Sequence, residues 1–396
     1  MVSREPVYIA GAYEHPTREA PEKSVPQLHA ESAKGALEDA GLQKEDVNGW
    51  LGCSVSDSHT TDRGPHVMAD YLGLDLTYGD SSDYDGAAPI AQIGHAASAI
   101  RDGKCDVALI TFGARPRTVA ADEPYWHIGD GHPPFQQQNF WYIYAPVTLN
   151  DYAMAARRHM HEHGTTHEQL AEVRVAASHH AQYNEHALFP EGEPVSVEDV
   201  VESKTISEPL NLLDCCVVSD GGGALVVVSE EVREDLDREC VEVLGQGEAV
   251  GDHEAGYLDI TTTAAEDSGA QAFEEAGLGP EDVDYVSLYD SFTITVVETL
   301  EDLGFCEKGE GGSFVEGGTL KAPDGELPFN TDGGGLSSNH PGRGGMFKVL
   351  ETVRQLRGEA HPEVQVDADI GLANAMGGTP AQFHGCSTVV LGSESR

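Results

Sequence analysis

An internal repeat constrains the fold of this chain more than any other feature. Residues 36–48 read ALEDAGLQKEDVN and residues 272–284 read AFEEAGLGPEDVD, with eight of the thirteen positions identical. Each copy predicts an amphipathic helix, a glycine cap, an acidic turn and an apolar strand, which is WLGCSV at 50–55 and YVSLYD at 285–290. A single repeat at half-chain separation indicates two pseudo-symmetric halves, because a solenoid needs several copies.

Strand and helix patterns alternate through both halves. We therefore expect an α/β fold with mostly parallel sheets covered on both faces, in two halves at 1–250 and 251–396. A long insertion at 116–205 begins with the aromatic stretch PYWHIGDGHPPFQQQNFWYIY and then becomes helical. The expected strands are 7–15, 47–55, 105–113, 221–229, 283–292, 369–378 and 386–392, and the expected helices are 24–41, 87–103, 267–277 and 346–358.

The charge of the chain limits its partners. Sixty-eight acidic residues against 23 basic ones give a formal net charge of -45, which repels nucleic acid and anionic membranes. The acidic residues are scattered along the chain, so we expect an acidic surface over the whole molecule, as suits a high-salt cytoplasm of a halophilic archaeon. An ordinary soluble acidic enzyme is the alternative. The start has no apolar signal-peptide core and no run of about 18 apolar residues occurs, so we expect a cytoplasmic protein.

Neither the cysteines nor the histidines predict a metal site. The 7 cysteines lack CxxC spacing, which argues against a disulfide framework and a structural zinc. His159, His161, His163 and His167 lie near the turn of two expected helices, but only two of the first three share a face and no H-E-x-x-H motif occurs. A solvated helix of the insertion explains them better.

A glycine-rich loop before a helix presents one histidine. Residues 327–358 read LPFNTDGGGLSSNHPGRGGMFKVLETVRQLRG, with His340 between three glycines and the helix. Glycine permits backbone turns that bring a loop close to a ligand, so His340 is the first candidate for a catalytic imidazole.

Longer strings carry a family resemblance. They are AIRDGKCDVALITFG, LLDCCVVSDGGGALVVVS, YDSFTITVVETLEDLGFCEKGEGGSF, LPFNTDGGGLSSNHPGRGG, ETVRQLRGEA and NAMGGTPAQFHGCSTVVLG. Together they resemble the thiolase superfamily, especially its lipid-transfer-protein or sterol-carrier-protein thiolase-like branch.

The resemblance implies a layered αβαβα fold with an inserted loop domain, in a homodimer or tetramer. It implies acyl-CoA substrates, with coenzyme A as part of the substrate and no tightly bound cofactor. Thiolases use a nucleophilic cysteine, an activating histidine, a second cysteine or histidine as acid and base, and an oxyanion hole.

Carried over residue by residue, the resemblance makes His340 the family's HP-G histidine. Tyr289, in YDSF, stands where the family has asparagine or histidine; its hydroxyl either faces the reacting carbonyl or is only structural. Asn330 is retained from the family pattern. The glycine-rich loops are expected to bind the coenzyme A thioester, with contacts from Gly334, Gly335, Gly377, Gly378 and Gly86.

The nucleophile is where the match fails. Counting back from Gly103 by the family spacing arrives at Gly86, which has no side chain to acylate. Ser82 would serve only if the register slipped by four residues. The second family cysteine falls at Asn374 or Ala375, and Asn374 is the candidate because it can donate a hydrogen bond. His384 and Cys386 follow in what we expect to be the last strand.

Three functions remain open. Without a thiol, the acyl-enzyme route of a thiolase has no acceptor for the acyl group. The family default is acyl transfer with formation or cleavage of a carbon–carbon bond. Some members of the branch that lack the cysteine are retro-aldolases on β-hydroxyacyl-CoA, which use tyrosines and a small OB-fold/zinc-ribbon partner. A non-catalytic acyl-CoA-binding subunit is the third possibility.

Overall fold

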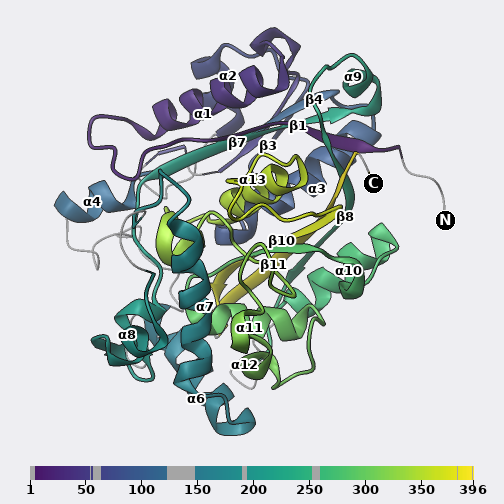
Figure 1. The fold of residues 1–396 in the computed structure, drawn as a ribbon. Coiled ribbons are helices and arrows are strands. Elements are labelled where there is room, and N and C mark those ends of the chain that lie inside the picture. The colour runs from purple at the N-terminus through teal and green to yellow at the C-terminus, as the bar shows by residue number, and fades with distance from the viewer. Residues whose placement is uncertain are drawn as a thin grey trace.

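The fold is described from a computed structural model, which covers residues 5–53, 55–56, 64–122, 148–189, 194–251, 259–380, 382–394 and 396. Figure 1 shows layers of helix and sheet stacked from α1 and α2 to α10 and α11. The aromatic stretch expected at 124–144 lies outside the described residues.

The internal repeat has the same local structure twice. Helix α1 (Val25–Ala40) ends at Gly41 with φ 72°, and α10 (Ala265–Ala276) ends at Gly277 with φ 69°. Each glycine takes the left-handed conformation that side chains disfavour and that closes a helix. A single 3₁₀ turn follows each, and then strand β2 (Gly49–Gly52) or β9 (Tyr285–Leu288). The duplicated helix and strand predicted from the sequence are confirmed.

Nine of the described strands form one sheet in the order β3-β2-β4-β7-β1-β8-β11-β10-β9. Its halves join where β1 pairs with β8 at only two positions. The remaining strands of this sheet are β1 (Val7–Glu14), β3 (Tyr78–Asp80), β4 (Val107–Ala114), β7 (Gly221–Ser229), β8 (Val241–Val250), β10 (Ile370–Thr379) and β11 (Gln382–Ser393).

The expectation of mostly parallel sheets is wrong. Parallel pairing joins β2 to β3 and β4, and β9 to β10, whereas β7 runs antiparallel to both β4 and β1. The chain leaves β4 into the insertion and re-enters the sheet from the same end, which reverses β7. A tight connection joins β10 to β11, which must therefore be antiparallel too.

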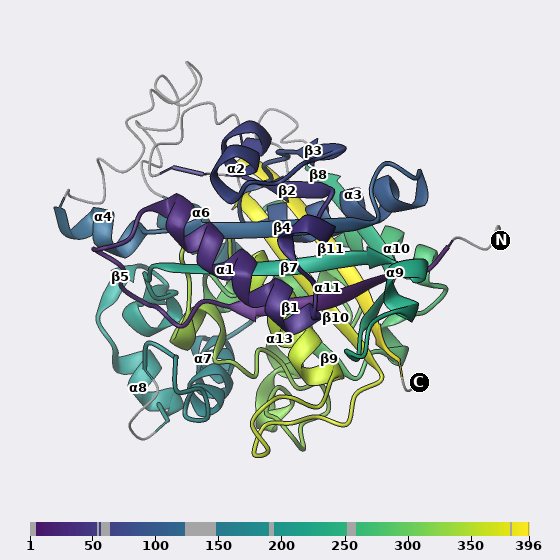
Figure 2. The same cartoon turned by 90° about the horizontal axis from the view of Figure 1, so that it is seen from above.

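Two helices lie between the halves of the sheet. Helices α3 (Ala88–Arg101) and α13 (Gly345–Leu356) are buried on almost every face, because each contacts strands of both halves. Helix α1 covers β1, β4 and β7 from outside, and α10 covers β8 and β11, with α11 (Thr293–Asp302) beside it. Figure 2 shows this stacking from above. The predicted αβαβα layering is confirmed.

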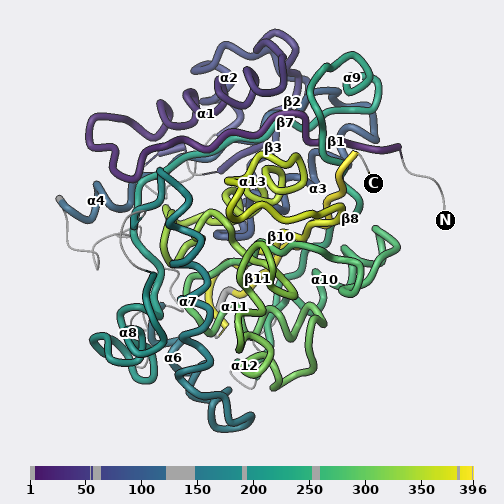
Figure 3. Tube along the Cα trace, viewed as in Figure 1, coloured from purple at the N-terminus to yellow at the C-terminus, as the bar shows by residue number. Residues whose placement is uncertain are grey.

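The part of the insertion from α6 (Thr148–His163) to α8 (Val197–Glu202) forms the helical lobe that the tube in Figure 3 shows beside the core. Helices α6 and α7 (His167–Ala181) contact α11, so the lobe reaches the C-terminal half. Strand β8 pairs at nine positions with β11 of the second half, and the division of the chain at residue 250 stays a prediction. The smaller elements are α2 (Gly64–Leu72), α4 (Pro116–Asp122), α9 (Glu230–Glu234), α12 (Gly311–Phe314), β5 (Thr205–Ser207) and β6 (Leu210–Asn211).

Within the described part of the chain, no helix combines the length and the apolar character that crossing a bilayer requires.

Candidate active site

Tyr289 and His340 meet at the inner layer of the fold. The His340 Nε2 lies 3.0 Å from the Tyr289 hydroxyl oxygen, and the two rings are edge-on with centroids 5.4 Å apart. The tyrosine hydroxyl also donates to the Gly342 carbonyl at 2.9 Å. Because a phenol has one proton and a carbonyl can only accept, this arrangement leaves a lone pair of the phenol oxygen for an Nε2–H of His340.

The end of β9 fixes the position of Tyr289. The Tyr289 N–H donates to the Asn374 carbonyl at 3.0 Å, next to the last parallel pair between β9 and β10. The Asn330 side chain accepts from the Leu288 N–H at 2.8 Å and donates to the Leu288 carbonyl at 2.9 Å. Asn330 adopts φ 43°, a left-handed conformation that asparagine tolerates better than most residues. These bonds leave the tyrosine backbone little freedom.

The two side chains are neutral at neutral pH. Desolvation lowers the pKa of His340 to about 4, although the Asp290 carboxylate opposes this shift. Burial raises the pKa of Tyr289 well above its usual value, since the ring is 6% exposed. The site therefore pairs an unprotonated imidazole that can accept a proton with a phenol that can donate one.

The glycine loop before His340 closes around Asp290. The Asp290 carboxylate accepts from the Gly335 N–H at 2.8 Å and the Leu336 N–H at 3.1 Å, and the Lys348 ammonium lies 2.7 Å away. A Cβ at Gly334, where φ is 61°, would be 2.2 Å from the same carboxylate.

Gly334 and Gly335 thus allow the loop backbone to approach the Asp290 carboxylate closely. Their N–H groups both donate to protein carboxylates: that of Gly335 to Asp290, and that of Gly334 to Asp332 at 2.9 Å. Whether they also contact coenzyme A stays a prediction. Asp290 and Lys348 were not among the predicted site residues, although Asp290 lies in the YDSF string beside Tyr289.

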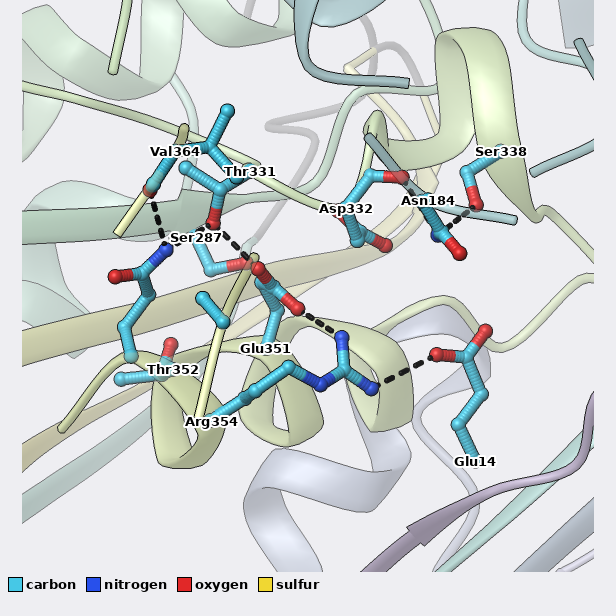
Figure 4. A network of polar contacts seen from close by, with 12 residues as sticks. Glu14, Asn184, Ser287, Thr331, Asp332, Ser338, Glu351, Thr352, Arg354 and Val364 are labelled. Atoms are coloured by element: carbon cyan, nitrogen blue, oxygen red, sulfur yellow. Dashed lines mark hydrogen bonds and ion pairs between the residues drawn. The ribbon is translucent and has the colours of Figure 1, made fainter. Parts of the chain in front are cut away.

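A buried polar network supports this loop from behind (Figure 4). Arg354 on α13 bridges Glu351 and Glu14, and Glu351 bonds the Thr331 hydroxyl. Asn184, just after α7, donates to the Asp332 carbonyl at 2.9 Å. The network therefore joins β1, α13 and the inserted lobe to the loop. Burial raises the pKa of Glu351 to about 7 and also raises that of Asp332.

Gly86 lies in the turn that opens α3, and the Tyr289 ring covers it. A Cβ on Gly86 would be 2.7 Å from the Tyr289 Cζ and 2.2 Å from the Met376 carbonyl oxygen. Contacts under 3.0 Å are not sterically allowed, so a side chain at position 86 and the present Tyr289 exclude each other. The tyrosine fills the space in which a nucleophilic cysteine would extend.

Ser82 belongs to a different cluster. Its hydroxyl donates to the Asp80 carboxylate at 2.9 Å and lies 3.2 Å from the His95 Nδ1. His95 itself lies between Asp80 and Glu248, and the hydrogen bonds that these carboxylates accept from its ring raise its pKa to about 9. A protonated imidazole cannot take a proton from Ser82, so this geometry does not activate the hydroxyl as a nucleophile.

Asn374 points away from the tyrosine–histidine pair. Its amide donates to the Thr388 hydroxyl at 2.9 Å, on the face of the sheet that α10 covers. Alternation along β10 turns the neighbouring Ala375 to the opposite face, towards Gly345 and the start of α13. We therefore leave Asn374 out of the proposed site.

The other C-terminal candidates have structural contacts. A Cβ at Gly377 would be 2.1 Å from the Tyr84 carbonyl, so this glycine allows β10 to meet the turn before α3. The Gly378 carbonyl accepts from the Tyr152 hydroxyl at 3.2 Å. The His384 Nε2 accepts from the Ala264 N–H at 2.8 Å, just before α10, which is a capping role.

Tyr152 on α6 is a buried tyrosine near the site that the sequence did not single out. Its ring packs on Phe292, three residues after Tyr289, with centroids 4.4 Å apart, and its hydroxyl lies 3.5 Å from the Met376 sulfur. In the string NDYAMAARRHM it is one apolar position of an amphipathic helix, so the sequence carries no signal for it.

A buried histidine of the inserted lobe has protein partners. His159 is buried, 3.0 Å from Glu301 and 2.8 Å from the Thr165 hydroxyl. Among the described residues, no group of three or more histidine, cysteine or acidic side chains could hold a metal ion.

Known proteins resemble the chain over nearly its whole length. The family model for the thiolase C-terminal domain-like region matches residues 247–393. An acetyl-CoA acetyltransferase of Methanothermobacter thermautotrophicus is 34% identical over 366 residues, 88% of this chain and 90% of that protein. A steroid side-chain-cleaving aldolase of Thermomonospora curvata is 35% identical over 347 residues, 84% of this chain and 85% of that protein.

The solved structure of the Ltp2-ChsH2(DUF35) aldolase covers 99% of both chains with a TM-score of 0.86 and 31% identity. Two relatives above 30% identity are each matched over more than four fifths of this chain. The chain is therefore an enzyme of the thiolase superfamily, in its sterol-carrier-protein thiolase-like branch, and acts on acyl-CoA thioesters.

Proposed function

We propose that this enzyme is a retro-aldolase that cleaves β-hydroxyacyl-CoA thioesters. The observation that carries the proposal is the contact between Tyr289 and Gly86: the ring lies 2.7 Å from where a Cβ on residue 86 would be. The site therefore has a neutral acid and a neutral base but no room for the thiolase nucleophile.

These two residues are sufficient for the chemistry of aldol cleavage. His340 accepts the proton of the substrate's β-hydroxyl on Nδ1, since its Nε2 carries the hydrogen donated to Tyr289, and the bond between the α and β carbons breaks. The β carbon becomes a ketone or aldehyde, and the bonding electrons form the enolate of the shortened thioester. Tyr289 then donates its proton to the α carbon, and the proton on His340 returns to Tyr289. All atoms are accounted for and no acyl-enzyme forms.

Acyl transfer is the family default and the second candidate. Acyl transfer requires a thiolate, but burial raises the pKa of every cysteine of the chain. This includes Cys216, whose negative charge would raise the pKa of Tyr289. The acetyltransferase relative nevertheless favours testing this reaction directly.

The proposal includes partners. The Ltp2-ChsH2(DUF35) aldolase supports a small OB-fold/zinc-ribbon chain as partner of this protein. Among the described strands, β3 is a terminal strand of the nine-stranded sheet, and we propose that its outer edge pairs with a second copy in a homodimer or tetramer. We expect coenzyme A to enter only as part of the substrate, without a tightly bound cofactor.

The test measures both reactions on the same protein. Purified chain, with and without a DUF35 partner, is given a β-hydroxyacyl-CoA, and separately acetoacetyl-CoA with free coenzyme A. We expect ketone or aldehyde release in the first assay, with at least a hundredfold lower kcat for Tyr289→Phe or His340→Ala. Ser82→Ala is the matched control and should keep its activity. Thiolysis of acetoacetyl-CoA without carbonyl release from the hydroxyacyl substrate would refute the proposal.

A further inference from the structure

An ion pair joins the two loops that meet at the site. The Arg343 guanidinium binds the Asp83 carboxylate in a two-pronged contact, with Nε–Oδ1 at 3.2 Å and Nη2–Oδ2 at 2.6 Å. Arg343 lies three residues after His340, and Asp83 lies three residues before Gly86. A two-pronged contact fixes direction as well as distance, and Arg343 is only 8% exposed.

Arg343 belongs to the peptide unit that accepts the tyrosine proton. The Gly342 carbonyl, 2.9 Å from the Tyr289 hydroxyl, is in the same rigid plane as the Arg343 N–H. Any rotation of that plane would turn the acceptor away from Tyr289. The position of the Arg343 side chain therefore helps to determine where the phenol proton points.

The rest of this segment has no side chain that could hold it. Gly342 has φ 107°, and a Cβ at Gly344 would be 2.8 Å from the Tyr289 Cε2. A Cβ at Gly345 would be 2.6 Å from the Gly86 carbonyl oxygen. Glycine is thus required for the close approach, but it leaves the backbone with more freedom than any other residue. Arg343 is the one residue of the segment Gly342–Gly345 with a side chain.

We propose that Arg343 is a positioning residue that acts through Tyr289, with Asp83 as its anchor. It holds the Gly342 carbonyl on the phenol, so that the free lone pair of the phenol oxygen faces His340. This positioning role rests on the proposed function, in which Tyr289 and His340 transfer the protons of aldol cleavage. Since the pair orients a catalytic group, its loss should lower kcat and leave KM within about twofold.

The test is a double-mutant cycle. Arg343→Met and Asp83→Asn should each lower kcat about tenfold or more, and Arg343→Lys should recover only part of the loss. In a Tyr289→Phe background, Arg343→Met should change kcat less than twofold, because the group it positions is gone. Arg238→Met is the matched control: Arg238 makes a two-pronged contact to Glu359 and should keep wild-type kcat. Equal losses in both backgrounds would overturn the proposal.

A crystal structure of Arg343→Met separates this inference from the proposed function. We expect the distance between the Tyr289 hydroxyl and the Gly342 carbonyl to exceed 3.5 Å, beyond hydrogen-bond range. Retention of the present distance would overturn the positioning role even if the protein proved an active aldolase. Loss of the contact in a protein without aldolase activity would support the positioning role while the proposed function failed.

Discussion

The His340 imidazole shows at the residue scale how the site can work at neutral pH. Its pKa is lowered to about 4 by desolvation, so the base form persists well below the usual histidine range. We expect the acid limb of kcat/KM to fall near pH 4 to 5. The measurement is a pH–rate profile, with circular dichroism at each pH to confirm that the protein stays folded. A limb at pH 6 to 7 in folded protein would contradict a desolvated base.

Gly86 and Tyr289 form a second test at this scale, because their positions exclude each other sterically. Gly86→Cys should lower the melting temperature through an overpacking cost of about 1–3 kcal/mol, and it should not produce thiolysis. Gly86→Cys with Tyr289→Asn removes only the contact with the ring, because the Met376 carbonyl oxygen still lies 2.2 Å from the new Cβ, so this variant should recover only part of the stability. Differential scanning calorimetry of the three proteins decides this. If the single variant is as stable as the wild type, the space at residue 86 is not filled as described.

The site itself could be predicted from the sequence only in part. His340 and Tyr289 stand in long strings that carry the family pattern, so both could be named in advance. Asp290 could not be given its role, because that role depends on the backbone N–H groups of Gly335 and Leu336, brought to it by folding. Tyr152 lies on another element, α6, and no local pattern distinguishes it from other apolar helix positions.

At the scale of elements, His95 joins α3 to β3 and β8. It contacts Asp80 at 2.8 Å and Glu248 at 3.1 Å, and its pKa is raised to about 9. Because the pKa of His95 is higher in the folded than in the unfolded protein, the protonated imidazole stabilises the fold. This contribution is complete below the unfolded-state pKa of about 6.5 and is lost as the pH rises through about 9.

The His95→Gln variant tests this contribution to stability. The difference in unfolding free energy between wild type and variant should be largest at pH 6 and shrink towards pH 10. Chemical denaturation across this range measures it, and subtraction removes the effect of other titrating groups such as His167. A difference that does not change with pH would show that His95 is not charged in the folded protein.

The helices and strands also show which parts of the fold are determined by nearby residues and could therefore be predicted. Helices α1 and α10 could be predicted because the amphipathic pattern and the glycine cap lie within the same short segment. The direction of β7 could not, since it depends on how the insertion returns the chain to the sheet. Pairing between the distant strands β1 and β8 likewise has no local signal.

At the scale of the whole molecule, the net charge of -45 dominates the electrostatics. Salt screens the repulsion among acidic groups: the Debye screening length is about 3 Å at 1 M salt and about 10 Å at 0.1 M. We therefore expect the melting temperature to rise steadily between about 0.1 and 2 M potassium chloride. Differential scanning fluorimetry along this series is the measurement. A melting temperature that stays constant or falls would argue for an ordinary acidic enzyme.

The most direct test of the central claim follows the proton that aldol cleavage places on carbon. A β-hydroxyacyl-CoA is turned over in heavy water without free coenzyme A, and the products are identified by mass spectrometry. The account predicts a ketone or aldehyde and a shortened acyl-CoA that carries one deuterium on its α carbon, both lost in Tyr289→Phe. Carbon–carbon cleavage that depends on added coenzyme A and yields two thioesters would contradict it.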